Sequence, residues 1–177
     1  MALNATMYRF SIDLTDLDRG VYENLSVHVA LHPSETMERM ATRLMAYCLN
    51  YSEALQFTKG LSDESVPDLW QKSYSDEIEH WIEMGLPDSK RIKKACSLAL
   101  RVSVYAYGGN AFEAWLTEAK KMQLKHSKLQ LFSIDQVGIE SFSGKIDRTM
   151  SLSCLIQDSS INLSWDEQML EIPVTQL

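Results

Sequence analysis

Two acidic residues, Asp68 and Glu83, stand in a stretch that runs PDLWQKSYSDEIEHWIEMG from residue 67 to residue 85. Carboxylate oxygens are ligands that a hard cation such as Mg²⁺ prefers, and two or three converging carboxylates would suit one. A cation held there would polarise a phosphate and lower the pKa of an attacking water. One acid on a strand, then acid-x-lysine on the next, outlines the hairpin of a metal-dependent nuclease, but Gly85 stands at the lysine position. The stretch therefore predicts the acidic half of such a site without its basic half.

Glu79 adds a third acid through the alternation of a strand. If residues 77–84 form a strand, Glu79 and Glu83 share one face with Trp81 between them, and the mostly apolar opposite face is expected to pack on a helix. Asp68, at the start of the neighbouring strand, could approach this face if the hairpin register permits. Acids on the solvated face of an edge hairpin give the same pattern, so a surface without a site remains the alternative.

Four basic residues follow in the next predicted helix: Lys90, Arg91, Lys93 and Lys94. By helical rotation Arg91 and Lys94 point to a common side, from which either could reach back over the end of the acidic strand. The N-terminus of the helix adds a further preference for anions. A solvated helix face explains the same run, and this alternative also stays open.

Other chemistries have little support. Cys48, Cys96 and Cys154 are far apart, form no C-x-x-C and lie in apolar surroundings, which predicts reduced core thiols. His80 lies on the apolar face of its predicted strand without a second histidine nearby, which favours a packing role. The chain has no glycine-rich phosphate loop and no G-x-S-x-G elbow.

The bulk composition fits one globular domain. The 177 residues are 45% hydrophobic and 23% charged, and no apolar run is long enough to cross a bilayer. The N-terminus alternates polar and apolar residues, which predicts a strand and not a signal peptide, so we expect a cytoplasmic protein without a membrane partner. The net charge of −7 opposes nucleic-acid binding, because phosphate contacts dominate affinity there. Any nucleic-acid contact must then rely on a local basic patch.

The predicted elements are mixed α+β in a single domain, residues 1–177. In chain order we expect paired strands at 4–13 and 25–32, a helix after Pro33, strands at 55–61, 68–73 and 77–84, a helix capped by Asp88, a strand at 100–107, and a helix from a capping box at Asn110 to about residue 124. The last fifty residues are expected to be strands, in the segments LQLFSID, MSLSCLIQD, INLSW and LEIPV.

Motifs along nearly the whole chain resemble the bacterial YaeQ family: MALNAT, DLDRG, HPSETMERM, LQFTKGL, PDLW, WIEMGLPDSKRIKKAC, VYAYG and DRTMSLSCLIQD. The block around WIEMGLPDSKRIKKAC is the most specific. That family is viewed as a variant of the PD-(D/E)xK nuclease-like fold with no settled activity. The resemblance implies a core of helix-strand-strand-strand-helix-strand over 34–107, with additional antiparallel β-structure from 1–33 and 125–177.

The resemblance also implies roles for particular residues. Asp68 takes the position of the first acid and Glu83 that of the second, and both would hold Mg²⁺, or Mn²⁺ in its place. Gly85 departs from the lysine of the general nuclease motif. In related nucleases a cation can come from the following helix, and here Lys94 or Arg91 is the candidate. The expected activity is metal-dependent cleavage of phosphodiester bonds in DNA or RNA.

Two further acids complete the candidate set. Glu38, on the polar side of the first helix, matches the auxiliary acid that some relatives carry, and Glu79 could stand in for it. Two other functions remain open. The same core could be a non-catalytic module that binds nucleic acid or a component of the transcription machinery, or an acidic module that binds only protein.

Overall fold

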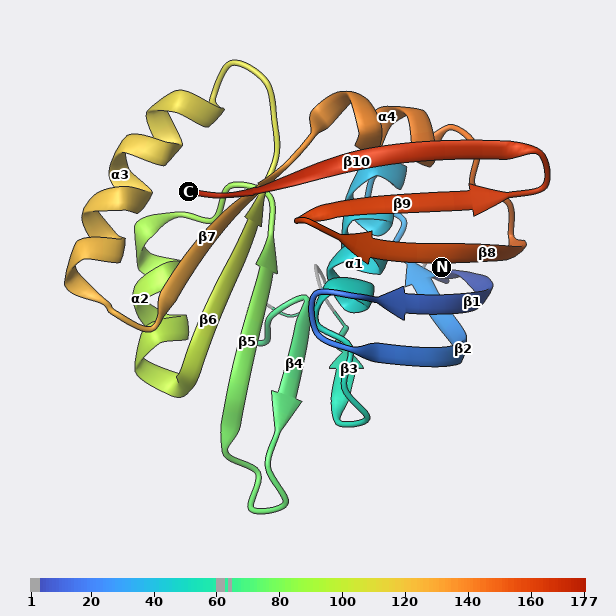
Figure 1. Ribbon diagram of the computed structural model, residues 1–177. Coiled ribbons are helices and arrows are strands. Elements are labelled where there is room, and N and C mark those ends of the chain that lie inside the picture. Colours follow the sequence, from blue (N-terminus) through green and yellow to red (C-terminus); the bar gives the residue numbers. More distant parts are fainter. Residues whose placement is uncertain (1–3, 60–62, 64) are drawn as a thin grey trace. The chain divides into compact units, whose positions relative to one another are not determined.

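The computed structural model describes residues 4–59, 63 and 65–177, and the contacts within it divide the chain into two compact units (Figure 1). The first unit comprises residues up to Leu49 together with Val137–Val174. The second comprises Asn50–Gln136 together with Thr175–Leu177. Within the described residues, no helix is long and apolar enough to span a membrane.

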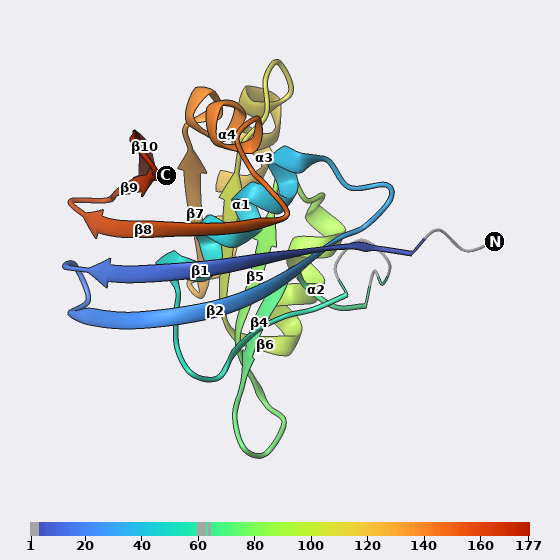
Figure 2. The same ribbon diagram turned by 90° about the vertical axis from the view of Figure 1, so that its right-hand side faces the viewer.

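The first unit is built on five strands in the order β2-β1-β8-β9-β10. Their bounds are β1 Thr6–Asp16, β2 Val21–Leu31, β8 Thr149–Gln157, β9 Ser160–Trp165 and β10 Gln168–Gln176, and the unit also contains helices α1 Met37–Leu49 and α4 Gln136–Ser143. Figure 2 shows β8, β1 and β2 side by side. β1 pairs antiparallel with β2, which confirms the predicted N-terminal hairpin, and parallel with β8.

Alternation and helical spacing account for the core of the first unit. Phe10, Ile12 and Leu14 alternate with exposed residues along β1, so one face of the strand is buried. The buried side chains of α1 include Met40, Ala41, Leu44, Met45 and Cys48, which recur at the helical spacing expected from the sequence. The Thr36 hydroxyl accepts the Arg39 N–H at 3.2 Å at the start of α1.

The second unit contains the strands in the order β7-β6-β5-β4-β3. Their bounds are β3 Leu55–Phe57, β4 Leu69–Lys72, β5 Ile78–Met84, β6 Ala99–Ala106 and β7 Leu129–Ile134, with helices α2 Ser89–Leu98 and α3 Phe112–Lys125. β4 pairs antiparallel with β3 and β5, whereas β5, β6 and β7 are parallel. The pairing of β4 with β5 confirms the predicted hairpin, and β6 is the buried strand that its apolar run predicted.

Over the described residues, four helices and ten strands confirm the mixed α+β class. Two predictions were wrong. The last fifty residues include α4, which lies between the predicted strand segments LQLFSID and MSLSCLIQD and whose buried Ile139 and Phe142 are at helical spacing. The Asn110 capping box does not form, because Ala111 is the N-cap, has a helical backbone and offers no capping side chain. The predicted strand at 55–61 forms over Leu55–Phe57, and its residues 60–61 lie outside the described part of the chain.

Candidate functional site

Asp68 directly precedes β4, and the β4–β5 hairpin places it beside the C-terminal end of β5. Leu69 pairs with Ile82, and the Asp68 N–H donates to the Ile82 carbonyl at 3.1 Å. The Asp68 carboxylate accepts the Met84 N–H through Oδ2 at 2.9 Å, and the residue is 1% exposed. A backbone donor and a fixed register thus hold this acid beside the last residues of β5.

Glu83 is 2% exposed and has two donors on the same oxygen. Its Oε1 accepts the indole N–H of Trp81 at 2.6 Å and lies 2.8 Å from Nε of Arg91. Burial, and then the negative charge of Asp68, raise the pKa of Glu83 from an ordinary 4.5 to about 7. The charge of Arg91 and its hydrogen bond lower the same pKa. The two acids are therefore close enough to interact.

Arg91 reaches Glu83 from the first turn of α2, as the sequence predicted for Arg91 or Lys94. The predicted cap is confirmed, because Asp88 has extended backbone angles and its side chain accepts the Arg91 N–H at 2.8 Å. Nη2 of Arg91 also donates to the Val66 carbonyl at 2.8 Å. The backbone cap and these two side-chain contacts define where the guanidinium lies.

Gly85 has a conformational reason to replace the lysine of the general motif. Its φ is +80°, in the left-handed region that residues with a Cβ rarely adopt, and its N–H donates to the Tyr105 carbonyl at 3.0 Å. A lysine there would be strained, whereas Arg91 supplies a cation from α2 without strain at this turn.

Lys94 is exposed and lines a cavity of about 690 Å³ beside the N-terminal half of α2. The other described lining residues are Ser65, Asp88, Lys90 and Arg91. Among the described lining residues three are cations and one is a carboxylate, so we call this the basic cavity, although the chain as a whole is acidic. Arg91 belongs both to this cavity and to the contact with Glu83.

On the face of β5 that carries Glu83, Trp81 is fully buried in one core cluster with Ile92 and Ala95 of α2, so this face packs on a helix. Ile82 and Met84 of the opposite, mostly apolar face are buried as well. The hairpin pattern does not show that β5 also pairs with β6. The alternative of a solvated acidic surface is contradicted for Asp68 and Glu83, which are buried.

Glu79 and Glu38 are the two remaining candidate acids. Glu79 accepts a hydrogen bond from Gln71 Nε2 at 2.7 Å, and Gln71 in turn accepts the Ser52 hydroxyl at 2.9 Å. Glu38 lies in the first turn of α1 and belongs to the first unit, whereas Asp68, Glu83, Arg91 and Lys94 belong to the second.

A buried histidine and serine form a contact that the sequence did not predict. His80 Nε2 lies 2.8 Å from Ser103 Oγ, and Nδ1 lies 2.9 Å from Nη2 of Arg101. A guanidinium only donates, so Nδ1 is the acceptor, Nε2 carries the hydrogen, and His80 cannot take a proton from Ser103. Burial and then the charge of Arg101 lower the pKa of His80 to about 3. His80 is thus a neutral packing residue, as predicted. The pairing of β5 with β6, which places Arg101 and Ser103 here, could not be found locally in the sequence.

The model of the family described as "YaeQ protein" matches residues 1–174. The chain belongs to the YaeQ family. It is 39% identical over 175 residues to a protein of Escherichia coli (strain K12), covering 99% of this chain and 97% of the relative. A protein of Salmonella typhi is 41% identical with the same coverage, and both relatives are described as "Uncharacterized protein YaeQ".

Solved structures of YaeQ proteins have the same fold. The crystal structure of the protein from Xanthomonas axonopodis pv. citri matches with a TM-score of 0.93 at 34% identity, covering 97% of each chain. That of the Pseudomonas syringae protein matches with a TM-score of 0.91 at 36% identity, covering 98% of this chain and 96% of the other. The family resemblance found in the sequence is therefore confirmed.

In this YaeQ-family chain, the carboxylates of Asp68 and Glu83 are oxygen ligands of the kind that a divalent cation such as Mg²⁺ prefers. Nowhere in the described residues do three or more histidine, cysteine, aspartate or glutamate side chains gather in a group that could hold a metal. Mg²⁺, however, is usually bound by one or two carboxylates and keeps several waters. Asp68 and Glu83 supply two carboxylates whose mutual repulsion a cation would relieve.

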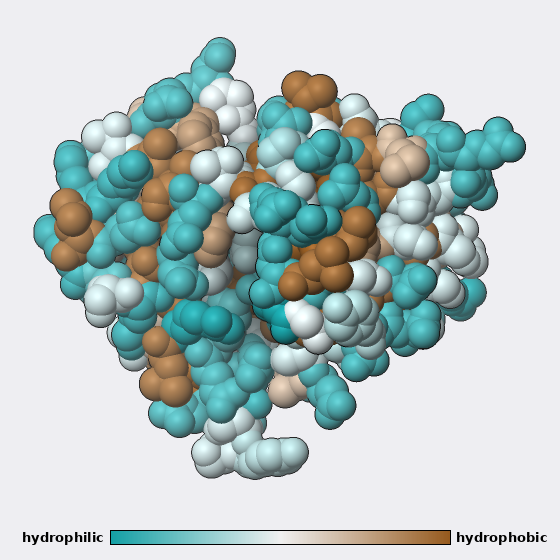
Figure 3. Space-filling view, in the orientation of Figure 1, coloured by the Kyte–Doolittle hydropathy of each residue, from teal (hydrophilic) through white to brown (hydrophobic). Residues whose placement is uncertain are grey.

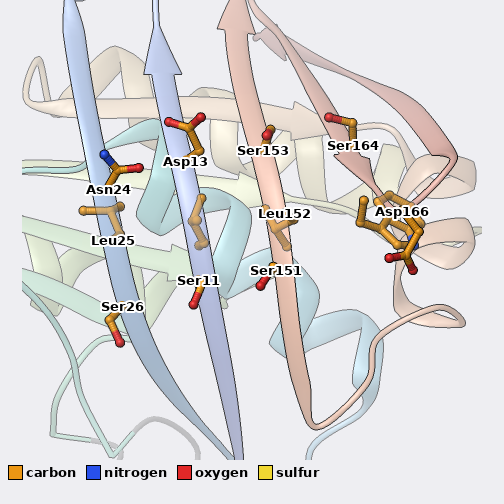
Figure 4. A pocket seen from close by; sticks show the side chains of 12 residues that line it. Ser11, Asp13, Asn24, Leu25, Ser26, Ser151, Leu152, Ser153, Ser164 and Asp166 are labelled. Atoms are coloured by element: carbon orange, nitrogen blue, oxygen red, sulfur yellow. The ribbon is translucent and has the colours of Figure 1, made fainter.

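A second cavity, of about 620 Å³, lies in the first unit on the outer face of β1, β2, β8 and β9 (Figure 4). Paired positions bring short polar residues into rows, with Ser11 opposite Ser26 and Ser151, and Asp13 opposite Asn24 and Ser153. These residues are exposed, and the described lining contains no cationic side chain. The cavity is a solvated trough between short side chains.

Apolar surface is distributed over several elements. On the face shown in Figure 3, hydrophobic side chains form separate patches among hydrophilic ones. The most exposed large apolar residues include Leu124 on α3 and Met169 on β10. Single exposed apolar residues are normal on protein surfaces, so they add no candidate to the acid pair.

Proposed function

We propose that this chain is a Mg²⁺-dependent phosphodiesterase that acts on nucleic acid, built on a variant of the PD-(D/E)xK nuclease-like core over residues 34–107. The order α1-β3-β4-β5-α2-β6 agrees with that core. The observation that carries the proposal is the 2.8 Å contact between Arg91 and Glu83, at an acid pair in which Asp68 raises the pKa of Glu83. A cation from α2 thereby completes the arrangement that Gly85 leaves incomplete.

Each residue has a distinct role in this proposal. Asp68 and Glu83 would hold Mg²⁺, or Mn²⁺, and the bound metal would polarise a phosphate and lower the pKa of water. Arg91 and Lys94 bind the phosphate in the basic cavity, where a guanidinium can hold two phosphate oxygens at once. Glu79 is left out of the set because it is engaged by Gln71.

Cleavage of single- and double-stranded DNA and RNA, with Mg²⁺ or Mn²⁺, tests this function. We expect Glu83→Gln to lower cleavage by more than about 100-fold, because even the partners of metal ligands are worth roughly 10- to 100-fold. Glu79→Gln is the matched control, an acid of the same strand that should keep its activity. Calorimetric titration with Mn²⁺ gives a readout independent of turnover. No cleavage by the wild type, together with no Mn²⁺ binding, would overturn the proposal.

The alternative is a non-catalytic module that binds nucleic acid or a protein, including a component of the transcription machinery. It is favoured by the Glu83 oxygen that already accepts Trp81 and contacts Arg91, and by the net charge of −7. Retention of a fluorescent oligonucleotide without turnover in either metal, weakened by Lys94→Glu, would support this alternative over the first.

A further inference from the structure

Arg91 is shared between two environments. Its Nε lies 2.8 Å from Oε1 of Glu83, which is 2% exposed, while its own side chain is 25% exposed and lines the basic cavity with Lys90 and Lys94. The guanidinium therefore has the buried acid pair on one side and a solvated cavity of about 690 Å³ on the other.

A divalent cation at the acid pair would compete with this guanidinium. Both are positive and both are drawn to Glu83, and charges near a buried group are screened less than charges in water. A metal held by Glu83 would lie next to Arg91 and repel it. While Arg91 stays in contact with Glu83, it therefore opposes the binding of a metal at the same carboxylate.

A phosphate in the cavity would compete for the same guanidinium from the other side. Arginine binds phosphate with two parallel hydrogen bonds, and the contact with Glu83 involves Nε of the same guanidinium. The backbone of Arg91 is held by the Asp88 cap, so a move of the guanidinium toward the cavity is a side-chain rotation that also releases the Val66 carbonyl.

We propose that Arg91 is a latch that pairs with Glu83 when the cavity is empty and turns to a phosphate when one binds, which opens Glu83 to a divalent cation. The latch rests on the proposed function. It adds that binding of the phosphate-bearing ligand favours binding of the metal. Coupling between two binding sites is reciprocal, so the metal also strengthens the binding of phosphate by the same factor.

The test is calorimetric titration with Mn²⁺, with and without a hydrolysis-resistant phosphorothioate dinucleotide. In the wild type we expect the dinucleotide to lower the Kd of Mn²⁺ by about 5- to 150-fold, the usual range for coupled sites. In Arg91→Met we expect Mn²⁺ to bind more tightly than to the wild type without dinucleotide, and the dinucleotide to have no further effect. Arg91→Lys, which keeps the charge, should fall between them and serves if the methionine variant does not fold.

Lys90→Met is the matched control, because it removes one charge from the same cavity without touching Glu83. It should weaken dinucleotide binding and leave the Kd of Mn²⁺ alone unchanged. Equal Mn²⁺ binding by wild type and Arg91→Met, with no effect of dinucleotide on either, overturns the latch but leaves the proposed metal site intact. Absence of Mn²⁺ binding in every variant and condition overturns the proposed function itself.

Discussion

Each unit of the chain contains a glutamate with a buried side chain that contacts an arginine from a helix. The two pairs differ in how far the arginine is exposed to solvent and in the charges around the pair. In the first unit, Arg43 of α1 holds Glu35 through two parallel contacts of 2.7 Å, and the two side chains are 4% and 3% exposed. Glu35 also accepts the His32 N–H, and Arg43 also donates to the Ala30 carbonyl. One negative and one positive charge face each other, enclosed by backbone groups.

The pair in the second unit is open and unbalanced. Arg91 contacts Glu83 through Nε, is 25% exposed and faces the basic cavity, and a second acid, Asp68, repels Glu83. A closed, balanced pair satisfies its own charges and indicates a structural role. An open pair with an additional acid beside it retains a tendency to bind charged ligands. For this reason only the pair of Arg91 and Glu83 is a candidate site.

Loss of the closed pair should have the largest effect. Arg43→Met leaves Glu35 buried without its cation, and we expect the free energy of unfolding to fall by about 3–5 kcal/mol. Arg91→Met should cost roughly 1 kcal/mol, because Arg91 is partly solvated and the raised pKa of Glu83 lets that carboxyl take up a proton. Urea unfolding at pH 7 measures both, and equal losses would contradict the distinction between the two pairs.

The dependence of stability on pH should reveal the unbalanced pair. The pKa of Glu83 is raised to about 7 in the folded chain from an ordinary 4.5, so the folded state binds more protons between these values. The contribution of Glu83 to stability is therefore highest below pH 4.5, falls as the pH rises to 7, and then levels, with a loss of roughly 3 kcal/mol.

Subtraction of the Glu83→Gln profile isolates that contribution, because glutamine does not titrate and all other groups are shared. Urea unfolding at a series of pH values gives both profiles. Parallel profiles for wild type and variant between pH 4.5 and 7 would show that Asp68 and burial do not act on Glu83 as described.

A small effect, similar to that of Arg91→Met, should come from the cap that positions the open pair. Asp88→Ala removes the side chain that accepts the Arg91 N–H, and we expect a loss of about 1 kcal/mol in unfolding free energy. Asp88→Asn keeps an acceptor and should lose less. Thermal unfolding compares them, and an alanine variant as stable as the wild type would show that α2 starts without this cap.

Local patterns predicted much of the candidate site. The spacing of acids and turn residues gave the β4–β5 hairpin, Asp88 marked the start of α2, and helical rotation placed Arg91 within reach of the acidic strand. These features depend on residues close in sequence, so a single sequence contains them. Lys94, from the same rotation, lines the cavity that Arg91 shares.

Features that depend on contacts between elements far apart in the chain could not be predicted from the sequence. The burial of Trp81 follows from the packing of α2 on this face of β5, and the His80 contacts follow from the pairing of β5 with β6. The left-handed conformation of Gly85 follows from the turn that leaves β5. Apart from the glycine itself, no pattern of neighbouring residues in the sequence indicates these features. They nevertheless determine which side chains of the hairpin are exposed to solvent.

The parallel pairing of β1 with β8 has a consequence for how the chain is made. Arg9 pairs with Thr149, so one edge of β1 lacks its neighbour until the ribosome has synthesised β8, long after the β1–β2 hairpin has emerged. Contacts so distant in sequence slow folding, and an unpaired strand edge is a template for aggregation. Residues 50–136 emerge between β2 and β8 and form most of the second unit. They can begin to fold before β8 is available to pair with that edge of β1. Nascent chains that stop before residue 149 should therefore be the species that most need a chaperone.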